Sequence, residues 1–126
     1  MNFAQWVFRI AGIYGILMMV PHYFMEQQIG FDFPPAITHP EYFYGFVGVT
    51  LAWQVLFLVL STDPARYRTM MLPCILEKLS YVIATTWLFL VDRVGTLIYS
   101  FALIDALLAA LFLASFLRTT ASSSTS

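Results

Sequence analysis

Four apolar stretches, each long enough to cross a lipid bilayer as a helix, occupy most of this 126-residue chain. They cover about residues 6–28, 41–60, 69–91 and 95–117. A spanning helix needs roughly 20 mostly apolar residues. Because lipid offers no hydrogen-bond partner to the backbone, helices are the expected spanning structure. The sequence therefore predicts an all-α integral membrane protein.

The composition supports the same class of protein. Charged residues make up 10% of the chain and hydrophobic residues 60%, whereas a soluble domain carries about 25% charged residues. The net charge of −1 gives no basic surface for nucleic acid. We expect one transmembrane domain over residues 1–118 and a polar, flexible tail over residues 119–126.

Short connections between consecutive helices predict an up-down-up-down four-helix bundle. One side of the membrane then holds four arginines, Arg9, Arg66, Arg68 and Arg118, and the other side holds only Arg93. Loops rich in lysine and arginine stay in the cytoplasm. We therefore expect both termini to be cytoplasmic, in a protein of the bacterial inner membrane.

Two features refine the first helix. Pro21 should kink this helix or end its regular part, because proline lacks a backbone N–H group and clashes with the preceding turn. Ala11 and Gly15 are four residues apart, and small residues at this spacing allow close helix approach in membranes.

Three ionisable residues, Glu77, Lys78 and Asp105, lie deep inside the third and fourth stretches. At 1.5 Å per residue, Asp105 lies about 12 Å from the outer face and Glu77 about 12 Å from the inner face. A charge at the bilayer centre costs about 3 kcal/mol on insertion scales, and such residues usually mark functional sites. We expect them to face the interior of the bundle.

Other polar residues are expected at a similar depth. Gln54 of the second helix and Tyr14 of the first fall near the level of Glu77, and Tyr81 follows Glu77 at i+4 on the same helix face. One polar chamber is therefore predicted to collect these side chains: Tyr14, Gln54, Glu77, Lys78, Tyr81 and Asp105.

Three interpretations of the charges stay open at this level. The first is a structural ion pair between Lys78 and either Glu77 or Asp105. The second is a ligand site in which a carboxylate binds the polar end of an apolar molecule. The third is a proton relay or acid–base site, so enzymatic activity is undecided. Two acids and one base leave one carboxylate without a cationic partner, which favours a functional role over a simple ion pair.

A second cluster of titratable residues lies near the outer end of the first helix. His22 and Glu26 are spaced i and i+4, and His39 and Glu41 begin the second helix. Two histidines and two glutamates are possible metal ligands, and a histidine is a possible axial ligand of a haem-like group. The spacing matches no specific metal signature, so a histidine–glutamate hydrogen bond is expected instead. We predict no metal and no cofactor beyond a bound lipid or quinone.

The segments VPHYFMEQQ, AWQVLFL and LPCILEKLSYVIATT resemble the four-helix core of EXPERA-type membrane proteins. DoxX-like four-helix proteins are a second family that the chain resembles. The EXPERA resemblance implies a chamber, open to lipid, that binds sterols and cationic amphiphiles with an acid on the first helix, here Glu26. The second acid of that family has no counterpart, because the matching segment, GVTLAW, is uncharged.

These observations together predict an intramembrane chamber for an apolar ligand such as a lipid, isoprenoid, quinone or sterol-like molecule. The residues expected to contact the ligand are Glu26, Glu77, Lys78, Asp105, Gln54, Tyr14, Tyr81 and His22. The alternative is a non-catalytic accessory subunit of a larger respiratory or photosynthetic membrane complex. Expected partners are the bilayer, the apolar ligand, and either a second copy of the chain or other subunits of a complex.

Overall fold

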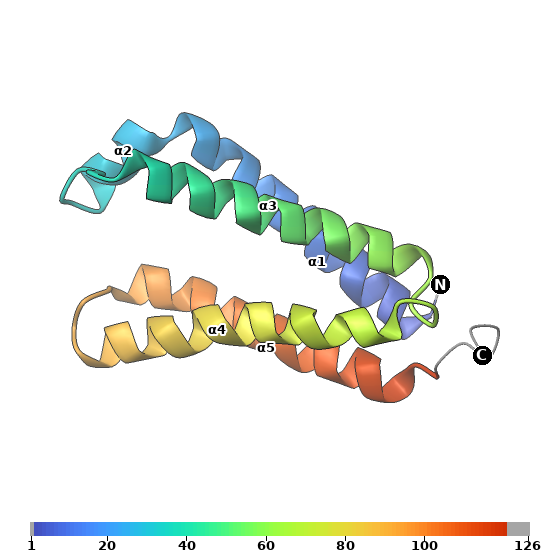
Figure 1. The fold of residues 1–126 in the computed structure, drawn as a ribbon. Helices are drawn as coiled ribbons and strands as arrows, with labels where there is room; N and C mark the ends of the chain where they lie inside the picture. The colour runs from blue at the N-terminus through green and yellow to red at the C-terminus, as the bar shows by residue number, and fades with distance from the viewer. Residues whose placement is uncertain (1, 121–126) are drawn as a thin grey trace. The chain divides into compact units, whose positions relative to one another are not determined.

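The computed structural model describes residues 2–120, and all regular structure in that range is helical (Figure 1). Most of the tail predicted to be flexible, residues 121–126, lies outside the described residues. The helices are α1 (Phe3–Met19), α2 (Glu26–Asp32), α3 (Pro40–Thr62), α4 (Met71–Leu90) and α5 (Thr96–Arg118), with short 3-10 helices η1 (Val20–Phe24) and η2 (Arg68–Met70).

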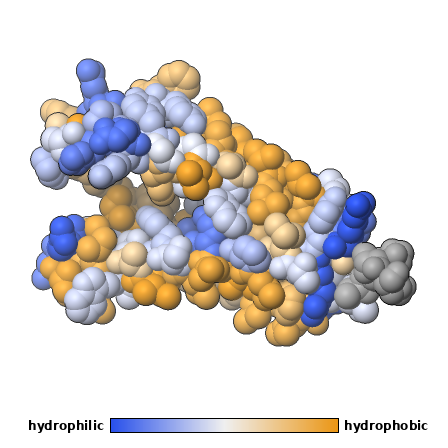
Figure 2. Space-filling view, in the orientation of Figure 1, coloured by the Kyte–Doolittle hydropathy of each residue, from blue (hydrophilic) through white to orange (hydrophobic). Residues whose placement is uncertain are grey.

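Four of these helical segments are long and apolar enough to cross a membrane. They are Phe3–Phe24, Pro40–Thr62, Arg68–Leu90 and Thr96–Arg118. Large apolar side chains lie on their outer surfaces, as Figure 2 shows; Leu17, Leu76 and Trp87 are 70%, 67% and 65% exposed. Such surfaces suit lipid rather than water. The predicted all-helical fold is confirmed, and its four long apolar helices support the prediction of a membrane protein.

The structure divides the first predicted helix into three parts. α1 ends at Met19, η1 carries Pro21, and α2 begins only at Glu26. Proline removes one hydrogen bond of the helix and clashes with the carbonyl four residues earlier, so the regular α-helix stops before it. α2 is therefore a separate short helix.

Within residues 2–120 the chain forms two compact units, one of residues 9–59 and the other of residues 2–8 with 60–120. In the first unit, the glycines of α1 show how α1 packs on α3. A Cβ at Gly12 would meet the Leu58 side chain at 2.8 Å, and one at Gly15 would meet the Gln54 side chain. The later residue of α1 meets the earlier residue of α3, so the two helices run antiparallel.

In the second unit, α4 and α5 form a helical hairpin, drawn side by side in Figure 1. Contacts between Lys78 and Asp105 and between Thr86 and Tyr99 show that these helices are also antiparallel. The start of α1 belongs to the same unit, where Phe8 stacks on Phe112 of α5 with ring centroids 4.3 Å apart. Both rings are fully buried.

A Schellman motif ends α4 and starts the turn to α5. The backbone N–H of Arg93 donates to the Leu88 carbonyl at 2.8 Å, and that of Asp92 donates to the Phe89 carbonyl at 3.1 Å. Asp92 takes the left-handed conformation, with φ of 60°, at the position where glycine is usual. This tight turn fixes which residues of α4 and α5 lie opposite each other.

Candidate functional site

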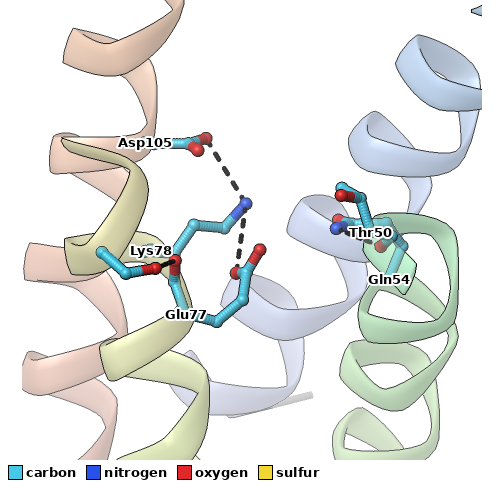
Figure 3. Close-up of polar contacts among 6 residues, drawn as sticks. Thr50, Gln54, Glu77, Lys78 and Asp105 are labelled. Atoms are coloured by element: carbon cyan, nitrogen blue, oxygen red, sulfur yellow. Dashed lines mark hydrogen bonds and ion pairs between the residues drawn. The ribbon is translucent and has the colours of Figure 1, made fainter. Parts of the chain in front are cut away.

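The candidate site is centred on Lys78, an ammonium group buried in the α4–α5 hairpin at 4% exposure. Its Nζ donates a hydrogen bond to Asp105 Oδ1 at 3.3 Å and lies 3.8 Å from Glu77 Oε2 (Figure 3). Lys78 therefore pairs with both acids, and Asp105 is the closer partner.

The two helices bring the three charges together in a simple way. Glu77 and Lys78 are neighbours on α4, about 100° apart around the helix axis, and the flexible lysine stem lets the two head groups meet. Asp105 comes from α5, directly opposite in the antiparallel hairpin. The carboxylates thus approach the ammonium from two helices, and the pair also ties α4 to α5.

The charges do not balance within this group. Two carboxylates and one ammonium give a formal charge of −1. Glu77 Oε2 is buried and accepts no hydrogen bond from any residue in the range 2–120, although an ionised carboxylate has room for about four. The side chains of Glu77 and Asp105 are 17% and 19% exposed. Glu77 Oε2 therefore has unused capacity to accept a hydrogen bond.

Polar groups continue along α4 toward its C-terminal end. Tyr81 lies one turn after Glu77 on α4, and the Thr86 hydroxyl donates to the Tyr99 hydroxyl of α5 at 3.3 Å. Buried Cys74 lies one turn before Lys78. Of the six residues predicted for one polar chamber, the structure places Glu77, Lys78, Tyr81 and Asp105 on the α4–α5 hairpin.

Gln54 and Tyr14, also predicted for the chamber, lie in the unit of residues 9–59. Gln54 is 1% exposed, and its Nε2 donates to the Thr50 carbonyl at 2.9 Å. Its Oε1 is buried and has no donor within the described part of the chain. Gly15 makes room for this amide, because a Cβ there would overlap with Oε1. Tyr14 is half-buried on α1.

His22 and Glu26 lie in the same unit of residues 9–59, on either side of the helix break. His22 Nδ1 donates to the Met18 carbonyl at 2.7 Å, and Glu26 interacts with the Tyr44 hydroxyl. His39 pairs with Glu41 at 3.2 Å, which is the predicted type of histidine–glutamate contact. Within residues 2–120, no three His, Cys, Asp or Glu side chains gather closely enough to hold a metal ion.

Glu26 also borders a shallow hollow of about 360 Å³. The hollow is formed by α2 and the segment after it, and its lining residues are Glu26, Gln27, Gly30, Phe31, Ala36 and Ile37. Glu26 is the one ionisable residue in this lining, so its carboxylate is the polar end of a mostly apolar surface.

Sequence reasoning missed the roles of Tyr44 and Arg68. Tyr44 contacts Glu26, and Arg68 donates from Nε to the carbonyls of Phe116 and Thr119 at 3.1 and 2.6 Å. The short turn between α4 and α5 could have predicted that Arg68 lies beside the end of α5. Counting outward from that turn places residue 68 opposite residues 116–119.

The chain was compared with protein-family models, curated proteins and solved structures, and no match was found in any of the three comparisons.

Proposed function

We propose that this protein binds an apolar ligand inside the membrane and holds the ligand's polar end at Glu77, Lys78 and Asp105. The observation that carries the proposal is Glu77 Oε2, a buried acceptor that receives no hydrogen bond from the described residues. A buried polar atom without a partner costs free energy. A ligand that donates a hydrogen bond removes this cost, so the site favours a hydroxyl or ammonium head on an apolar body.

The location of the site decides what kind of body the ligand has. Glu77 lies in the span Arg68–Leu90 and Asp105 in the span Thr96–Arg118, both far from the helix ends. A molecule that reaches these carboxylates from the bilayer must itself be lipid-soluble. Lipids, isoprenoids, quinones and sterol-like molecules are the classes we propose.

The resemblance to EXPERA-type and DoxX-like proteins supports the interpretation of this chain as a four-helix ligand-binding protein. The proposed site uses the α4–α5 hairpin alone. Glu26, His22, Tyr14 and Gln54 belong to the unit of residues 9–59, and the proposed site does not depend on them.

We further propose that the four spans alternate in direction across a bacterial inner membrane, with both termini in the cytoplasm. The distribution of arginine supports this orientation. Arg66, Arg68 and Arg118 flank the spans on the proposed cytoplasmic side, and Arg93 lies in the turn between α4 and α5. Positive residues are retained on the cytoplasmic side of inner membranes.

The experiment that tests the ligand proposal is native mass spectrometry of the protein purified in mild detergent. We expect the mass of the chain or its homodimer with a defined adduct of lipid-like mass. A bare chain in every preparation would contradict the proposal. Co-purification with other membrane subunits at fixed stoichiometry, without an adduct, would instead favour an accessory subunit in a larger complex.

A further inference from the structure

We propose that a cluster of three arginines, Arg66, Arg68 and Arg118, binds the phosphate of an anionic phospholipid at the open end of the α4–α5 hairpin. This would be a second lipid site, separate from the carboxylates deep in the hairpin. Its ligand is recognised through a headgroup phosphate whose negative charge is not offset by a headgroup cation, rather than through an apolar body.

Arg68 organises the cluster because it joins the two helices at this end. Its Nε donates to the Phe116 and Thr119 carbonyls at 3.1 and 2.6 Å, so it caps the C-terminus of α5. Its guanidinium carbon lies 3.8 Å from the centre of the Phe116 ring. These contacts fix the plane of the guanidinium. Both hydrogen bonds use Nε, so neither of them involves the four N–H groups of the two Nη atoms.

Arg118 and Arg66 add two more cations close by along the chain. Arg118 lies between Phe116 and Thr119, the two residues whose carbonyls Arg68 contacts, and its guanidinium lies 4.3 Å from the centre of the Phe3 ring. Arg66 lies 5.6 Å from the Tyr67 ring centre. An arginine stacked on a ring keeps its N–H edge for other partners. Two N–H groups of such an edge match two oxygens of a phosphate.

The charge at this end is not neutralised by nearby acids. Asp63 is the one acid in the connecting segment, and its Oδ1 accepts the backbone N–H of Arg66 at 3.3 Å. Three arginines against one aspartate leave a net charge of +2. At the other end of the hairpin, Asp92 and Arg93 balance each other. The hairpin is therefore strongly asymmetric in charge.

The cluster also lies at the ends of two candidate spans, where lipid phosphates are expected. One candidate span begins at Arg68 and another ends at Arg118, so both residues mark the edge of the apolar zone. Figure 2 shows hydrophilic residues gathered beside the end of α5. Basic residues just outside a membrane span attract anionic lipids. The ring contacts of Arg68 and Arg118 orient these two side chains before a lipid binds.

The test is native mass spectrometry of the full chain in detergent, titrated with phosphatidylglycerol or with phosphatidylcholine of the same acyl chains. We expect preferential retention of phosphatidylglycerol. The variant Arg66→Gln/Arg118→Gln should lose about thirtyfold in this preference. Arg93→Gln, which removes one arginine from the other end of the hairpin, should keep the preference. Arg68 is left in place because it caps α5.

Three results would overturn the proposal. One is equal retention of the two lipids by the wild-type chain. Another is an equal loss of preference in Arg93→Gln, which would show a general charge effect. The third is complete displacement of phosphatidylglycerol by excess inorganic phosphate, which would show a site for free phosphate. Thermal unfolding of each variant checks that it is folded, and Arg66→Gln alone serves if the double variant is not.

Discussion

At the scale of single residues, the chain's most unusual feature is an ammonium group buried among apolar helices. Two carboxylates stabilise Lys78 there, because Asp105 lies 3.3 Å away and Glu77 3.8 Å away. Breaking a buried ion pair costs far more than the pair itself contributes, since one charge is left without a partner. The two acids nevertheless differ in role.

Asp105→Asn should destabilise the protein by about 3 kcal/mol, because Lys78 loses the carboxylate that accepts its hydrogen bond and the Glu77 carboxylate lies farther away. Glu77→Gln should change stability by less than about 1 kcal/mol, because it removes the surplus charge and leaves the Lys78–Asp105 pair intact. Unfolding of both variants in mild detergent measures the difference. A larger loss for Glu77→Gln would show that the roles are reversed.

Gly15 is a second residue whose role can be tested directly. A Cβ at Gly15 would overlap with Oε1 and Cδ of Gln54, so the buried amide would have to move. Gly15→Ala should cost about 1–3 kcal/mol through overpacking.

Gly45→Ala is the matched control for this substitution. A Cβ at Gly45 meets no atom within 4 Å, and alanine stabilises a helix by about 0.5–1 kcal/mol over glycine. Thermal unfolding of the two variants should therefore shift in opposite directions. Equal shifts would mean that the contact between Gly15 and Gln54 does not matter.

Sequence reasoning identified the charged residues but could not pair them. The depth of Glu77, Lys78 and Asp105 can be inferred from their distance to the ends of apolar stretches. Which acid pairs with Lys78 depends on side-chain rotamers and on sub-ångström helix register, and neither is written in the hydrophobic pattern. The rotamer of Gln54, which leaves its Oε1 without a donor within residues 2–120, was equally out of reach.

At the scale of elements, the apolar stretches predicted the long helices to within a few residues. α5 was expected over about residues 95–117 and occupies Thr96–Arg118. The first stretch was less accurate, since Pro21 was expected to kink or end it, but the separate α2 was not foreseen. A proline shows where a helix is broken, whereas the conformation of the chain beyond the break depends on local packing.

The turn between α4 and α5 offers a test at this scale. Asp92 holds the left-handed conformation, φ of 60°, which costs a non-glycine residue about 1–2 kcal/mol and glycine almost nothing. Aspartate tolerates this region better than most residues, so Asp92→Gly should stabilise the protein by about 0.5–1 kcal/mol. Asp92→Val should destabilise it by a similar amount or more.

Unfolding by heat or denaturant in detergent measures both Asp92 variants. The Schellman hydrogen bonds of Arg93 and Asp92 are made by the backbone and stay available in each. If glycine and valine at this position gave the same stability, the left-handed conformation would not describe the turn.

At the scale of the whole molecule, the proposed orientation in the membrane rests on the unequal distribution of arginines between the two ends of the spans. It predicts that the turn at Val94 faces outward and that Thr119 faces the cytoplasm. In a Cys74→Ser background, Val94→Cys should react with an impermeant maleimide on intact cells or spheroplasts. Thr119→Cys should react only after the membrane is permeabilised, and the opposite pattern would reverse the topology.

The central claim is that Glu77 Oε2, which accepts no hydrogen bond within residues 2–120, binds the polar end of a membrane-soluble molecule. The most direct test compares adduct occupancy by native mass spectrometry in the wild type, Glu77→Gln and Glu41→Gln. Glu41 undergoes the same chemical change at an exposed position, 65% exposed, where it pairs with His39. We expect a bound molecule of defined mass in the wild type and Glu41→Gln, and its loss in Glu77→Gln. Equal occupancy in all three proteins, or none in the wild type, would contradict the claim.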